Sequence, residues 1–141
     1  MNTKEQANQL ISEVCAYYGF DRSLLTRNGS YKPIRSLIVN NERIDVSSVR
    51  MALALFISTY TDINNYVIGP MCGYQDHTTL VYIRKKGAYY IELEDFKFMP
   101  YWESVCKIAQ KIGMTTRYIR VKPQKTKIMV DSTQINLAMS K

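Results

Sequence analysis

The 141-residue sequence contains one histidine, three cysteines and no run of about 18 apolar residues. The absence of a long apolar run argues against a membrane-spanning helix. Cys15, Cys72 and Cys106 lie far apart and form no CxxC pair, so a structural zinc site would lack its usual ligands. An odd number of thiols in apolar surroundings is typical of a reducing cytoplasm, and we expect all three to be buried.

Patterns associated with catalysis are also missing. Neither a serine nor a cysteine lies in a recognisable nucleophile motif, and no pair of acidic residues has an evident partner. No GxxxxGK[ST] loop is available for nucleotide phosphates. We therefore expect a protein that is not an enzyme and uses neither a metal nor another cofactor. The opening MNTKEQANQL does not resemble a signal peptide, which predicts a cytoplasmic protein.

Charge is unevenly distributed along this basic chain, whose formal net charge is +7. Residues 1–88 carry ten basic and seven acidic residues, and residues 89–110 carry two and four. Residues 111–141 carry seven basic residues and one acidic residue. A basic tail of this kind favours an anionic partner such as nucleic acid, although a solvated basic surface is the simpler alternative.

Apolar residues recur at the three- and four-residue spacing of amphipathic helices in several segments. The segment 47–60 is apolar on nearly all sides, so we expect a central, mostly buried helix that begins after Ser47 or Ser48. Two β-branched runs around Asn40-Asn41 predict a small β-hairpin, and residues 116–131 predict a second, basic one. We expect helices over residues 4–18, 21–25, 47–60, 63–69, 75–86 and 100–112.

The fold class that follows is a mainly α bundle with a helix-turn-helix, a C-terminal helix and a small β-hairpin. Two short helices joined at GPMCGY behind a buried helix give the helix-turn-helix pattern. We place a helix-turn-helix domain in residues 1–88. Residues 89–141 then form a C-terminal extension, with a helix at about 100–112 and a basic tail from 113, which offers a surface for a protein partner or for self-association.

The second helix of that pattern opens with polar side chains and ends with basic ones. Recognition helices contact base edges through their amino-terminal residues. Asp76 can accept a hydrogen bond from a cytosine amino group, His77 can donate to a base acceptor, and threonine methyls can pack on a thymine methyl. The basic residues 84–86 can bind phosphates near the other end of the helix.

The segment VRMALALFISTYTDINNYVIGPMCGYQDHTTLVYIRKK resembles the C-terminal DNA-binding domain of the bacterial replication initiator DnaA. Shared features are the arginine that opens a buried helix, a glycine turn and the Asp-His-Thr-Thr run, and the likeness covers about residues 8–88. The resemblance implies a Trp-repressor-like helical fold that binds double-stranded DNA. It places Arg50 in the minor groove and basic loop residues on phosphates. The implied DNA contacts are Arg27, Lys32, Arg35, Arg50, Gln75, Asp76, His77, Thr78, Thr79, Arg84, Lys85 and Lys86.

The chain departs from the family pattern at several positions. Gln75 replaces the family's arginine and favours adenine, while Tyr74 replaces a glycine. Pro70 is foreign to the first helix of the motif and is expected to shorten it. About a dozen residues are inserted before Arg50, and the family's ATPase region is missing. We therefore expect a stand-alone relative from a phage or mobile element, acting in replication control or transcriptional regulation. Its expected location is the cytoplasm of a bacterium or of an infected host cell.

Alternative interpretations stay open at this point. Asp76 can be a simple helix cap, the two threonines can be ordinary first-turn residues, and Arg50 can extend along the surface into solvent. The other function class is a protein-interaction or virion-associated module that keeps this fold but no longer reads bases. The basic tail alone would then supply nonspecific contacts.

Overall fold

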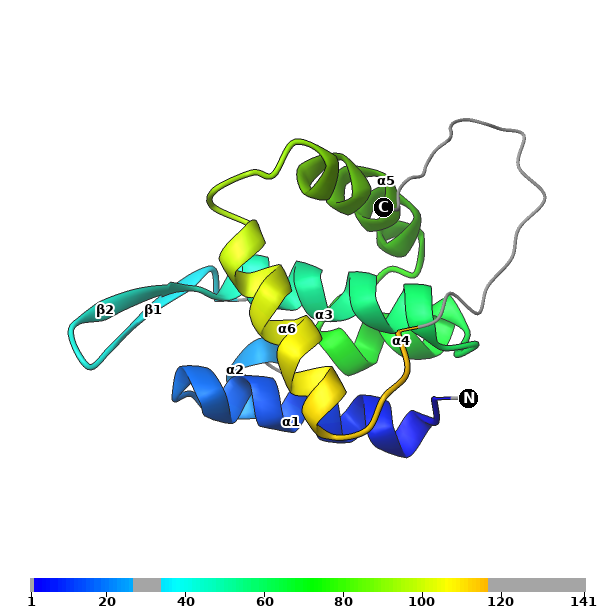
Figure 1. Cartoon of the computed structure of the whole chain (residues 1–141), viewed down its shortest axis with the longest axis horizontal. Coiled ribbons are helices and arrows are strands. Elements are labelled where there is room, and N and C mark those ends of the chain that lie inside the picture. Colours follow the sequence, from blue (N-terminus) through cyan, green and yellow to red (C-terminus); the bar gives the residue numbers. More distant parts are fainter. Residues whose placement is uncertain (1, 27–33, 117–141) are drawn as a thin grey trace.

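The computed structural model describes residues 2–26 and 34–116, and this part of the chain is mainly helical (Figure 1). A single two-stranded antiparallel sheet accompanies the helices in the described ranges. The predicted fold class, a helical bundle with a small β-hairpin, is confirmed. The elements are α1 (Lys4–Tyr18), α2 (Arg22–Thr26), β1 (Ser36–Val39), β2 (Glu42–Asp45), α3 (Val46–Tyr60), α4 (Asn65–Cys72), α5 (Thr78–Glu92) and α6 (Met99–Lys111).

Helix α3 is the centre of the bundle and contacts α4, α5 and α6. Its side chains Leu53, Phe56 and Ile57 are completely buried, as the nearly continuous apolar sequence predicts. The helix is capped by Asp45, whose Oδ1 accepts a hydrogen bond from the backbone N–H of Ser48 at 3.2 Å. The prediction of a serine cap is therefore wrong. Asp45 lies three residues before Ser48, and its second carboxylate oxygen accepts a hydrogen bond from the Ser48 hydroxyl at 3.1 Å.

Helix α1 covers one side of the bundle and packs against α2 and α6. Thr3 and Gln6 form a reciprocal capping box at its start, which satisfies two backbone N–H groups. Gly19 ends the helix in the left-handed conformation with φ +82°. The helix has the predicted bounds because both of its ends are specified by local sequence.

The β1–β2 hairpin projects away from the helices in Figure 1. Asn40 and Asn41 connect the strands with φ values of +52° and +65°. Positive φ at both central positions is the requirement of a type I′ turn, which asparagine tolerates better than most residues. The prediction of a hairpin around these two asparagines is confirmed.

Helix α6 belongs to the same body as the preceding helices. It packs on α1 and α3, with Val105 and Ala109 fully buried. The predicted boundary after residue 88 falls inside α5, which continues to Glu92. A separate extension beginning at 89 is therefore a wrong prediction, because the apolar face of α6 completes the core. The predicted basic hairpin at 116–131 lies, beyond Thr116, outside the described residues.

The three thiols are largely withdrawn from solvent. Cys15 and Cys72 are buried, as predicted, whereas Cys106 is partly exposed. Burial raises the pKa of Cys15 to about 11 and those of Cys72 and Cys106 to about 12. All three side chains are therefore neutral thiols at physiological pH.

Candidate nucleic-acid interface

The turn between α4 and α5 is fixed at Gly73, which closes α4 with φ +95°. The backbone N–H of Tyr74 donates to the Gly69 carbonyl at 2.8 Å, which completes the helix end. A Cβ atom on Gly73 would overlap the carbonyl oxygen of Leu25, so only glycine lets the turn lie against the end of α2. Gly73 therefore sets where α5 begins.

Pro70 lies inside α4, which continues to Cys72. The expectation that this proline shortens the helix is wrong. The proline is exposed, so its ring meets solvent rather than a neighbouring element. Although proline removes one hydrogen bond of the helix, the Gly73 cap and the completely buried Ile68 and Cys72 hold the last turn in place.

Gly69 allows the start of α5 to approach α4 closely. A Cβ atom there would meet the Tyr74 carbonyl oxygen at 3.3 Å and the Cα atom of His77 at 4.0 Å. In the Ile68-Gly69 pair, the buried Ile68 side chain holds α4 against the core, and the absence of a Cβ atom on Gly69 leaves room for the following turn. This packing places residues 75–79 at the surface beside the first half of α4.

Residues 75–79 project outward at the amino end of α5. Gln75, Asp76 and Thr78 are exposed, whereas His77 and Thr79 are partly exposed. The helix begins at Thr78, three residues later than the predicted start at residue 75. The first three residues of the run, 75–77, therefore belong to the turn that leads into α5.

The exposed Asp76 side chain also stabilises the turn before α5. Its Oδ1 accepts a hydrogen bond from the Thr78 backbone N–H at 3.0 Å. Hydrogen bonds from the backbone and hydroxyl of Thr78 hold the pKa of Asp76 below its usual value. Asp76 therefore holds the turn before α5, whereas the N-cap position itself is occupied by His77, whose side chain makes no capping bond. The side chain is still 65 % exposed and can accept a further bond from outside the protein.

His77 is oriented by a stacked aromatic ring. The Tyr66 ring, on the first turn of α4, lies 3.8 Å from the imidazole centroid at an interplanar angle of 25°. The imidazole keeps 38 % of its surface exposed, and its Nδ1 lies 3.6 Å from Asp76 Oδ1. Sequence reasoning missed Tyr66, because a contact across the turn leaves no helical or strand periodicity.

Removing the Tyr66 ring is expected to free the imidazole without unfolding the protein. The Tyr66→Ala variant should broaden the range of side-chain orientations of His77, whereas Tyr66→Phe should keep the stack. NMR spectra of the single histidine would show this as averaged imidazole shifts in the alanine variant only. Equal spectra for the two variants would contradict an orienting role for the ring.

The basic residues at the middle of α5 differ in their surroundings. Lys85 is exposed, and Lys86 Nζ donates to the Tyr82 hydroxyl at 2.7 Å. Hydrogen bonds with Tyr82 and Tyr90 raise the pKa of Lys86. Arg84 is partly buried and its Nη2 donates to the Ser58 carbonyl at 3.5 Å. Lys85 is thus the most exposed member of this triplet.

Arg50 does not reach the surface. Its side chain is 3 % exposed, and its Nε and Nη2 donate to the Leu25 carbonyl at 3.1 and 3.0 Å. Nη2 also donates to the Ile34 carbonyl at 3.1 Å, and burial lowers the pKa of the guanidinium. The expectations of a minor-groove contact and of a solvated side chain are both wrong. Arg50 instead joins the end of α2 to the segment before β1.

The other predicted phosphate contacts lie on the loop that precedes β1. Arg35 is exposed, and its backbone carbonyl accepts a hydrogen bond from the Ser47 N–H at 3.1 Å. Its backbone is thereby fixed next to the start of α3 while its side chain faces solvent. Arg27 and Lys32 lie outside the described residues.

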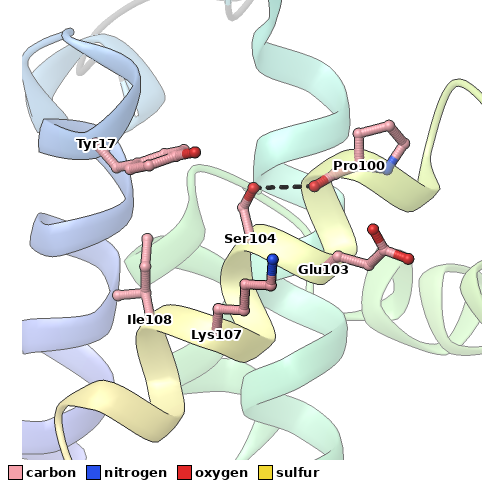
Figure 2. A pocket seen from close by; sticks show the side chains of 6 residues that line it. All are labelled: Tyr17, Pro100, Glu103, Ser104, Lys107 and Ile108. Atoms are coloured by element: carbon pink, nitrogen blue, oxygen red, sulfur yellow. Dashed lines mark hydrogen bonds between the residues drawn. The ribbon is translucent and has the colours of Figure 1, made fainter.

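A hollow of about 200 Å³ lies between Tyr17 on α1 and α6 (Figure 2). The Ser104 hydroxyl at its edge donates to the Pro100 carbonyl at 3.0 Å and accepts from the Tyr18 hydroxyl at 2.8 Å. The Ser104 hydroxyl therefore already donates one hydrogen bond and accepts one within the fold. The hollow is smaller than a usual small-molecule site of about 300–1,000 Å³. Its lining residues are Tyr17, Pro100, Glu103, Ser104, Lys107 and Ile108.

In residues 2–26 and 34–116, no cluster of three or more histidine, cysteine, aspartate or glutamate side chains could hold a metal ion. Among the helices of the same residues, none combines the length and apolar character needed to cross a bilayer. Comparison with known proteins gives no match to a family model, to a curated protein or to a solved structure. The functional proposal below therefore rests on the geometry of α4 and α5.

Proposed function

We propose that the protein binds double-stranded DNA in a sequence-dependent manner, with the amino end of α5 in the major groove. The observation that carries this proposal is the outward projection of residues 75–79 from a rigid turn. Gly73 fixes the path of that turn, and the Tyr66 ring orients His77. Polar groups held in this way lose little conformational freedom on binding, which favours selective contacts.

Each exposed side chain of the run has a suitable partner on a base pair. The Gln75 amide can form two hydrogen bonds with adenine, and Asp76 can accept from a cytosine amino group. His77 can donate from its exposed edge to a purine acceptor. Thr78 and Thr79 offer a methyl group to thymine and a hydroxyl to a base or phosphate. Arg35 supplies an accompanying phosphate contact.

The resemblance to the DNA-binding domain of DnaA supports the proposal through residues 75–79 and the glycine turn. The buried Arg50 removes one expected element, the minor-groove arginine. Recognition in this chain therefore depends on α5 more than the resemblance implies. Replication control and transcriptional regulation are the roles that fit a stand-alone binder. The lysines and arginines within residues 117–141 would add phosphate contacts.

Selection of random duplexes on the purified protein tests the proposal. We expect an enriched motif for the native chain, and we expect His77→Ala to reduce the preference for that motif by about 10- to 100-fold, the value of one good base contact. The free energy of unfolding should fall by only about 1 kcal/mol, the value of the lost stack on Tyr66, because the imidazole is partly exposed. Gln110→Ala, on the exposed side of α6, is the control and should keep the motif.

The other function class predicts a different result of the same experiment. A protein-interaction or virion-associated module would enrich no motif, and its affinity for DNA would not change in His77→Ala. Truncation after Thr116 would then abolish all DNA binding, since only the basic tail would contact phosphates. That combination of results would overturn the proposal of base recognition.

A further inference from the structure

A stripe of large side chains lies exposed on the carboxy-terminal half of α5. Tyr82, Tyr89 and Leu93 are 55 %, 58 % and 59 % exposed. They follow the spacing of one helical face, and the buried residues Leu80, Ile83 and Gly87 lie on the opposite face against the core. Several large apolar groups gathered on one exposed face mark an interaction surface rather than ordinary solvent contact.

Charges along the same face are separated by sign. Lys85 and Lys86 lie on the amino-terminal side of Tyr89, and Glu92 lies on its carboxy-terminal side. Lys86 is held in place, because its Nζ donates to the Tyr82 hydroxyl at 2.7 Å and lies 5.3 and 5.7 Å from the ring centroids of Tyr82 and Tyr90. The stripe therefore presents a fixed cation and an acid on either side of an aromatic ring.

The charges of this face are complementary to those of a second copy of the helix that runs in the opposite direction. If two copies of the stripe run antiparallel about a two-fold axis at Tyr89, Lys85 faces Glu92 of the second copy, because these two residues lie on the same flank of the interface. Lys86 then lies opposite Leu93 of the second copy, whose side chain can cover the lysine stem. A parallel arrangement would place like charges opposite one another, which is unfavourable. A two-fold axis of this kind is the commonest symmetry of protein dimers.

We propose that the protein forms a two-fold dimer through the Tyr82–Leu93 stripe of α5, with the two helices antiparallel. Nucleic acid is a poorer occupant of this face, because Glu92 would repel phosphates and Leu93 would gain nothing from them. The dimer leaves the amino ends of both α5 helices free, since they lie at the far ends of the pair. The structure thus separates a self-association surface from the candidate DNA surface on a single helix.

The dimer has a consequence for DNA that rests on the proposed function. Thr78 precedes the axis residue Tyr89 by 11 positions. At about 1.5 Å per residue, the two Thr78 residues lie about 33 Å apart. Dimeric helix-turn-helix proteins contact half-sites separated by about 34 Å, one turn of the duplex. We therefore expect a target made of two inverted half-sites with centres one helical turn apart.

Sedimentation equilibrium of the full chain without DNA tests the dimer by itself. We expect the native chain to dimerise, and we expect Tyr89→Glu to weaken the dimer at least about tenfold by placing two carboxylates at the axis. Tyr17→Glu is the matched control, because Tyr17 is 66 % exposed on α1, and should leave the dimer unchanged. A native chain that stays monomeric at its solubility limit would refute the dimer.

Charge exchange identifies the surface even if Tyr89→Glu fails to fold. Lys85→Glu and Glu92→Lys should each weaken the dimer, and an equimolar mixture of the two should dimerise again because opposite charges then face each other. Failure of the mixture to associate would overturn the antiparallel pairing. If these variants change affinity for nucleic acid but leave the oligomeric state unaltered, the stripe binds nucleic acid instead and the proposal is wrong.

The two proposals can fail separately. A dimer that enriches no DNA motif would keep the self-association surface and remove the proposed function. A monomer that enriches a single half-site would do the reverse. A dimer that enriches two directly repeated sites would contradict the two-fold arrangement on DNA.

Discussion

Replacement of Gly73 with alanine is expected to lower the free energy of unfolding by about 3 kcal/mol or more. Two effects add at this position. The backbone has φ +95°, which disfavours any residue with a Cβ atom, and that atom would also overlap the Leu25 carbonyl oxygen. Relief of the overlap requires movement of the turn away from α2. Urea unfolding followed by circular dichroism would measure the loss.

Gly113 is a matched control for this substitution. It has φ +89°, but a Cβ atom there would meet nothing within 4 Å. Gly113→Ala should therefore cost only the conformational part, about 1 kcal/mol. Equal losses for the two variants would show that the contact with Leu25 carries no energy. Because Gly73 sets the start of α5, its variant should also bind DNA more weakly than Gly113→Ala does.

Replacement of Arg50 with methionine is expected to cost about 2–4 kcal/mol of unfolding free energy. Methionine retains an unbranched apolar stem but donates no hydrogen bonds. The Leu25 and Ile34 carbonyls would lose the donors that now lie at 3.0–3.1 Å, and a buried acceptor without a partner costs about 1–3 kcal/mol. Thermal unfolding of the variant and of Arg43→Met, an exposed arginine on β2, would separate this effect from general loss of charge.

The same variant decides between two roles for Arg50. A structural residue should alter stability, while the folded protein keeps its DNA motif and the salt dependence of its affinity. A minor-groove contact, as the resemblance to DnaA implies, should instead weaken DNA binding and reduce the salt dependence, with little loss of stability. The buried position predicts the first result.

Features specified by neighbouring residues were predicted well from the sequence. The bounds of α1 follow from a capping box and a terminal glycine, and the hairpin follows from Asn40-Asn41. Residues 75–79 were expected at the surface, and the structure places them there. These signals act over at most four residues, so they do not depend on the rest of the fold.

Features that depend on distant residues were not predictable in the same way. Arg50 is buried because its acceptors come from positions 16 and 25 residues away, which no local pattern reveals. The stack of Tyr66 on His77 requires the turn at Gly73 to bring two helices together. Likewise, the place of α6 in the core depends on the apolar faces of α1 and α3 that it covers.

The raised pKa values of the three thiols make the chain suitable for site-specific labelling. Maleimides react with the thiolate, and pKa values of about 11 to 12 leave almost none of it at neutral pH. A cysteine introduced at an exposed position, such as Gln75, would therefore react well ahead of the native three. A single fluorophore could then be attached beside the turn without first removing Cys15, Cys72 or Cys106.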